Sequence, residues 1–112
     1  MRVWRLGVLM IGLPLAAKAG TVHSLMELAR QQVGRSEPHE ARLEGQQADH
    51  FLKLTHGRGP VNIQTFLIRP INPECSQIRT RVLVQQVPRR DGQTGDFWMD
   101  FQISLCRNGN PP

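Results

Sequence analysis

The stretch that decides the fold is CSQIRTRVLVQQVPRRDGQTGDFWMDFQISLC, residues 75–106. It contains two runs rich in apolar, β-branched and aromatic residues, 77–87 and 96–105, joined by a segment rich in turn-forming residues, 88–95. Two such runs on either side of a turn segment predict a β-hairpin. A cysteine stands just outside each run, and pairing Cys75 with Cys106 sets the register, because the numbers of paired residues then sum to 181.

This register gives the hairpin two different faces. The apolar face pairs Ile78 with Ile103, Thr80 with Phe101, Val82 with Met99 and Val84 with Phe97. The other face sets Arg79 opposite Gln102, Arg81 opposite Asp100 and Leu83 opposite Trp98. The apolar pattern, the opposite charges and the cysteines therefore select the same alignment.

The first 19 residues have the pattern of a secretory signal peptide. Arg2 and Arg5 precede an uncharged apolar run, 6–17, and Ala17 and Ala19 supply the small residues that signal peptidase recognises. The run is shorter than the ~20 apolar residues that a membrane-spanning helix needs. We therefore expect residues 1–19 to be removed and residues 20–112 to form a single small domain in the periplasm or outside the cell, with no membrane anchor after cleavage.

Removal of this segment changes the charge of the chain. Three of the 14 Lys and Arg residues lie in it and none of the 9 acids does, so residues 20–112 carry a net charge of +2. The remaining cations are scattered among acids and form no long basic run. This composition argues against nucleic acid as a partner.

An exported chain with two cysteines is expected to form one disulfide, because the compartment beyond the membrane is oxidising. The alternatives for Cys75 and Cys106 are a metal site and a catalytic thiol. Both are disfavoured, because the chain has no CxxC motif and no histidine at ligand spacing beside either cysteine.

Upstream of the hairpin, the sequence predicts one helix and two more strands. Apolar residues recur at helical spacing in 21–34, where Ser24 and Glu27 have capping-box spacing and Gly34 is a natural stop. Residues 35–48 are left without a firm assignment, although 38–43 could form a short helical turn. Segment 50–56 fits a helix end or a strand, and the turn signal at 57–60 before the strand 61–68 favours a second hairpin. Pro70 and Pro73 are expected to interrupt the strand pairing, and 107–112 to form a frayed tail.

The predicted fold is therefore α+β, with one N-terminal helix packed on a four-stranded antiparallel meander and one cross-strand disulfide. This arrangement resembles that of the cystatin-like proteins, which include secreted protease inhibitors and several exported bacterial domains. Cystatins carry Gln-x-Val-x-Gly in their first hairpin loop, whereas Gln31-Gln32-Val33-Gly34 is one residue shorter and ends the predicted helix. This difference argues against inhibition of cysteine proteases, so no functional residue of the cystatins is assigned to a position in this chain.

Enzymatic and metal sites find little support in the sequence. No serine lies in a Gly-x-Ser-x-Gly elbow, and His50 and His56 would stand about 20 Å apart at the two ends of a strand. We expect no cofactor and no metal. The alternative is a small envelope hydrolase, which would need His39, His50 or His56 to meet a carboxylate in a cleft.

Trp98 is the residue that most favours a binding role, because it lies on the polar face opposite Leu83 and beside Arg81. Tryptophan and arginine are enriched at protein contacts. The sequence thus predicts a non-enzymatic protein-binding module, such as an accessory part of an envelope or secretion assembly, or an inhibitor or immunity protein. The candidate contact residues are Trp98, Arg79, Arg81, Leu83, Arg89 and Arg90. A purely structural role for these residues stays open. Trp98 could be covered by the helix or by residues 35–49, or it could stack on Arg81 at the surface. Arg89 and Arg90 could simply lie in a solvated turn.

Overall fold

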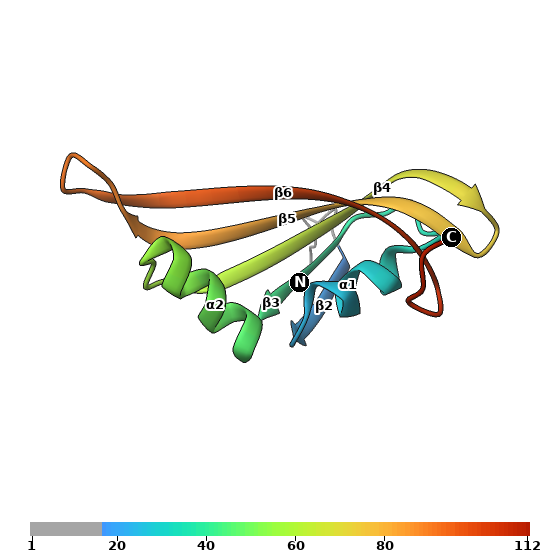
Figure 1. The fold of residues 1–112 in the computed structure, drawn as a ribbon, viewed down its shortest axis with the longest axis horizontal. Coiled ribbons are helices and arrows are strands. Elements are labelled where there is room, and N and C mark those ends of the chain that lie inside the picture. Colours follow the sequence, from blue (N-terminus) through green and yellow to red (C-terminus); the bar gives the residue numbers. More distant parts are fainter. Residues whose placement is uncertain (1–16) are drawn as a thin grey trace, which may run out of the picture.

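A computed structural model describes residues 17–112 of the chain, which form a five-stranded sheet with two helices on one face (Figure 1). The predicted signal segment lies outside the described residues, apart from 17–19. The strands stand in the order β2-β3-β4-β5-β6, with β2 parallel to β3 and every other pair antiparallel. In chain order the elements are β2 (Ala17–Val22), α1 (Leu25–Gln32), β3 (His39–Leu43), α2 (Gln46–Thr55), β4 (Val61–Asn72), β5 (Cys75–Pro88) and β6 (Thr94–Cys106).

The hairpin of β5 and β6 confirms the predicted register. Paired residues follow the sum of 181 from Cys75 with Cys106 to Val84 with Phe97, and a disulfide joins the two cysteines. Beyond Val84 the register shifts, and Gln86 has a φ of 56°, so a bulge bends β5 before the tip. The far end of this long hairpin projects past the helices in Figure 1.

Helix α1 is shorter than predicted, but its start follows the capping signal. Ser24 is the N-cap and its Oγ accepts a hydrogen bond from the Glu27 backbone N–H at 3.1 Å. The Glu27 carboxylate in turn accepts from the N–H of His23, at 3.0 Å. Val22, which lies inside the predicted helical segment 21–34, instead ends β2 and is buried there.

The segment left without a firm assignment contains strand β3, so the alternative of a helical turn was wrong. Its side chains alternate: His39, Ala41 and Leu43 are buried, whereas Arg42 is exposed. Five alternating residues have little strand preference by themselves. They become a strand because β2 and β4 pair with both edges of the segment.

The strand favoured over 50–56 was also wrong, whereas the alternative of a helix end is confirmed, because residues 50–55 belong to helix α2 and His56 is its C-cap. Ala48 and Phe51, three residues apart, form the buried side of the helix. The helix ends at His56, which adopts the left-handed conformation with a φ of 60°. The four-stranded antiparallel sheet with one helix is thus corrected to a five-stranded mixed sheet with two.

Two smaller expectations are only partly met near the disulfide end of the hairpin. Strand β4 ends at Asn72, just before Pro73, as expected, but it continues through Pro70, which pairs with Ser76 between two register shifts. The tail is not frayed at its start, because the Arg107 N–H donates to the Glu74 carbonyl and the Cys106 N–H to that of Asn110, both at 2.9 Å.

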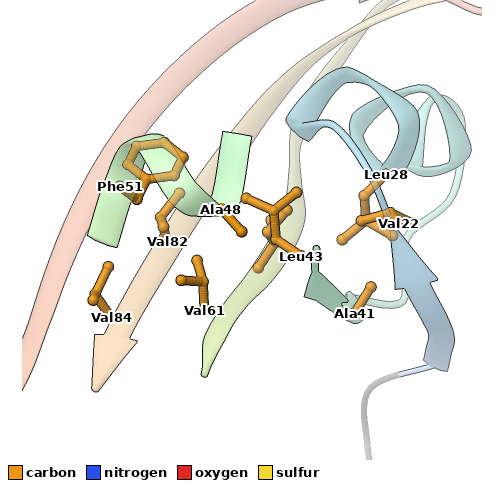
Figure 2. Close-up of a cluster of buried hydrophobic side chains, with 10 residues drawn as sticks. Val22, Leu28, Ala41, Leu43, Ala48, Phe51, Val61, Val82 and Val84 are labelled. Carbon is orange, nitrogen blue, oxygen red and sulfur yellow. The ribbon is translucent and has the colours of Figure 1, made fainter. Parts of the chain in front are cut away.

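The core lies between the helices and the sheet (Figure 2). Figure 2 shows Phe51 and Ala48 of α2 facing valines of β4 and β5, while Leu28 of α1 lies over Val22. A second, smaller cluster of Ala29, Val33, Ile78 and Leu105 lies at the disulfide end of the sheet. The two clusters hold both helices on one face, and the other face carries polar side chains together with Phe66, Leu83 and Trp98.

Candidate functional site

Trp98 and Arg81 form a stacked pair on the polar face of the hairpin. The register places Leu83 opposite Trp98, so Arg81, two residues earlier on β5, lies diagonally across from the indole. The Arg81 Cζ atom stands 4.4 Å from the centre of the Trp98 ring, within the range of a cation–π contact. Trp98 is still 40 % exposed. The stack therefore presents a large aromatic surface to solvent with its cation held in place.

Asp100 links Arg79 and Arg81. Arg79 Nε donates a hydrogen bond to Asp100 Oδ1 at 3.2 Å. Arg81 Nε lies 3.2 Å from the same oxygen, but its N–H is not aligned for a hydrogen bond, so that contact is an ion pair alone. All three side chains are partly exposed, so we expect these ion pairs to orient the arginines rather than to add much stability.

The stack belongs to a row of side chains that crosses the sheet. Arg42 pairs with Asn62, Asn62 with Leu83 and Leu83 with Trp98, and in the described chain both helices lie on the opposite face. Leu83 is half-buried beside the indole. The predicted group of Trp98, Arg79, Arg81 and Leu83 thus forms one contiguous patch, named here the Trp98 patch.

Arg89 and Arg90 do not join this patch. They are exposed at the hairpin tip, beyond the bulge in β5, and Arg89 lies six positions after Leu83. At the rise of a β-strand this is about 20 Å. The Arg89 guanidinium packs against Gly95, where any side chain would collide with it. The tip is therefore a separate feature with its own local packing.

An apolar groove on the other face was not predicted from the sequence. It has a volume of about 500 Å³ and lies between α2 and β6, with Phe51, Leu54, Met99 and Phe101 among its walls. A second hollow of about 390 Å³ adjoins it at Leu54 and Met99. The sequence held part of the evidence for this groove, because the hairpin register places Phe97, Met99 and Phe101 on one face. Without α2, the opposite wall was unknown.

The histidines have ordinary structural surroundings. His39 is buried, and its Nδ1 lies 2.7 Å from Gln32 Oε1. His50 lines the apolar groove, whose walls include no carboxylate, and His56 ends α2. Within residues 17–112, no three His, Cys, Asp or Glu side chains come close enough to hold a metal ion. Neither of the two helices described is long and apolar enough to cross a bilayer.

Comparison with known proteins gives no relative for this chain: no protein family, no curated protein and no solved structure matches it.

Proposed function

We propose that this chain is a small exported, non-enzymatic module that binds another protein through the Trp98 patch. Its tasks would be those of an accessory component in an envelope or secretion assembly, or of an inhibitor or immunity protein. The partner contributes a surface that covers the indole and accepts hydrogen bonds from the arginines.

The observation that carries the proposal is the exposed stack of Arg81 on Trp98. Tryptophan and arginine are enriched among the few residues that contribute most of the binding energy at protein interfaces. The stack is preorganised, since Asp100 holds both arginines and the sheet holds Trp98. A partner that covers it therefore orders few additional side chains.

Export is supported by the N-terminal sequence and by the disulfide. A disulfide in a small domain is typical of an oxidising compartment, which fits a periplasmic or secreted protein. Cleavage before Gly20 would leave the inner part of β2 in place. Gly20 and Val22 pair with Ala41 and Leu43, and the Glu44 N–H donates to the Val22 carbonyl at 3.0 Å. The core position of Val22 would survive processing.

The proposal is tested by capture of the partner with a folded variant of the patch. The exported, oxidised chain serves as bait in an envelope extract of its source, beside a Trp98→Ala, Arg81→Ala variant. We expect one defined protein to be retained by the wild type and lost with the variant. Because both side chains are partly exposed, the free energy of unfolding of the variant should lie within about 1–2 kcal/mol of that of the wild type.

Arg42→Ala is the matched control. It removes an exposed arginine from the same face of the sheet, three strands away from Trp98, and should leave retention unchanged. Equal retention by the wild type and the Trp98 patch variant would contradict the proposed contact surface. Loss of the partner with Arg42→Ala as well would point to general attraction by positive charge.

A further inference from the structure

Strand β6 is the last strand of the sheet, and its outer edge is open. It spans 13 residues, and within 17–112 no other element pairs with that edge or covers it (Figure 1). Open edges invite pairing with another chain, and proteins commonly protect them with lysine, proline or short strands. Residues 94–106 contain no lysine, arginine or proline. The edge is therefore long, and its only charged side chains are those of Asp96 and Asp100.

The side chains along this edge are aromatic on both faces. Phe97 is 43 % exposed and Phe101 is 39 % exposed on the helix-bearing face, with Met99 between them, and Trp98 lies on the other face. A strand added to the edge would cover apolar surface on either side of the sheet. This combination favours pairing with a strand of the same apolar alternation.

Along β6, the backbone N–H and C=O groups that point away from β5 belong to the even-numbered residues. The Cα atoms of Cys75 and Cys106 stand 3.8 Å apart, which marks the closer, non-hydrogen-bonded type of antiparallel pair. Because the two types alternate along an antiparallel ladder, Trp98, Asp100 and Gln102 direct their N–H and C=O groups away from β5. Cys106 would do the same, but its N–H already donates to Asn110. The usable edge therefore ends before Cys106.

We propose that β6 pairs with β6 of a second copy of this chain, antiparallel about a two-fold axis at Met99. In this register the numbers of paired residues sum to 198, so residues 94–104 of the two copies lie opposite one another. Phe97 faces the partner's Phe101, Met99 faces the partner's Met99 and Trp98 faces the partner's Asp100. The two sheets join into one sheet of ten strands.

Charge and face together select this register. An odd sum would set apolar side chains of one copy against the polar face of the other. A register in which paired residue numbers sum to 200 would place Asp100 opposite the partner's Asp100. A register with a sum of 196 would place Asp96 opposite the partner's Asp100. A sum of 202 would need Cys106, which the tail occupies. The sum of 198 is thus the longest alignment that avoids directly opposed aspartates and leaves the tail in place.

Pairing of the two edges gives hydrogen-bond partners to the outward-directed backbone N–H and C=O groups of β6 and covers its exposed aromatic side chains. Two Phe97–Phe101 pairs cover exposed aromatic area, and such cross-strand pairs are among the favourable ones in sheets. Asp100 is neutralised in its own chain by Arg79 and Arg81, which lowers repulsion across the axis. A two-fold contact of this kind is closed and produces dimers rather than fibres. The inference needs no foreign partner, but the added strand would lie beside Trp98 of the proposed contact patch.

The register is tested by cross-linking through single added cysteines. The full chain is expressed, and the folded product is compared as wild type, Met99→Cys and Gln102→Cys under mild oxidation. Met99 forms a non-hydrogen-bonded pair with its own symmetry mate, at a Cα separation of about 4.5 Å that suits a disulfide. We expect Met99→Cys to yield a species of twice the mass, and Gln102→Cys, which faces the partner's Asp96, to yield little of it.

A second measurement does not depend on the added cysteines. Light scattering should give the wild type twice the mass of one chain, falling to one chain on dilution. Gln102→Pro removes an N–H that points to the open edge and spares the β5–β6 ladder, so it should give a folded monomer with unchanged circular dichroism.

Three results would overturn the proposal. They are a wild type with the mass of one chain at every concentration, a dimer that Gln102→Pro leaves intact, and a dimer cross-linked by Gln102→Cys in preference to Met99→Cys. A wild type that gains mass only when mixed with an envelope extract would also exclude self-pairing, and it would fit a foreign partner bound through the Trp98 patch.

Discussion

Gln32 is the residue on which the buried polar structure of the core depends. Its side-chain oxygen accepts from His39 Nδ1 at 2.7 Å and from the Thr65 hydroxyl at 2.8 Å. Its amide nitrogen donates to the carbonyls of Arg35 and Glu37 at 2.7 and 2.8 Å. These two acceptors fix the orientation of the amide, and the proton of neutral His39 must therefore be on Nδ1. One side chain thus links α1, β3, β4 and the loop after α1.

We expect Gln32→Ala to lower the free energy of unfolding by about 2–4 kcal/mol, because it leaves two buried donors and two carbonyls without their partner. Urea unfolding followed by circular dichroism measures the change. Gln31→Ala, at the exposed neighbouring position, should alter stability by less than about 0.5 kcal/mol. Equal losses from the two substitutions would show that the network contributes nothing beyond helix propensity.

At the scale of elements, helix α2 is placed by its two ends and by a single buried side. It begins after Gly45, which has a φ of 93° and makes no side-chain cap, and it stops at His56 in the left-handed conformation. Just after this stop, Gly57 and Gly59 lie against β5, where added Cβ atoms would collide with Val84 and Gln85. The close approach of this turn brings α2 over β5 and sets one wall of the apolar groove.

His56→Gly is expected to stabilise the protein by about 0.5–1 kcal/mol, because glycine adopts a positive φ without steric strain. His56→Val should destabilise it, since a β-branched residue is strained in that conformation. Thermal unfolding of both variants gives the comparison. Lys53→Gly is the control, because glycine inside the helix should destabilise it by about 1 kcal/mol. A destabilised His56→Gly would mean that the histidine side chain itself holds the helix end.

At the scale of the whole molecule, the disulfide end joins parts that are distant in the chain. The bridge closes a loop across 31 positions and lies beside the smaller core cluster. The tail contributes there too, because Arg30 Nε of α1 donates to the Arg107 carbonyl at 3.1 Å. The base of the hairpin, the helix and the tail are therefore stabilised together.

Removal of the bridge in a Cys75→Ser, Cys106→Ser variant should lower the free energy of unfolding by about 3–4 kcal/mol in the chain-entropy description. Denaturant unfolding with and without reductant measures this. The wild type should lose stability when reduced, while the serine variant should not respond to reductant. A wild type equally stable in both conditions would contradict a stabilising role for the bridge.

The sequence by itself determined the register of the hairpin and the cap of α1, because both depend on local pattern: alternation, two cysteines, and Ser24 three residues before Glu27. It also pointed to Trp98, Arg81 and Leu83 as neighbours, since the register follows from the same pattern. Only the tertiary structure decided that 39–43 is a strand and 46–55 a helix. Their short apolar patterns are compatible with more than one state, and contacts with β2, β4 and β5 select between them. The apolar groove and the open edge of β6 likewise exist only once the sheet order is set, because exposure is a property of what the remaining chain leaves uncovered.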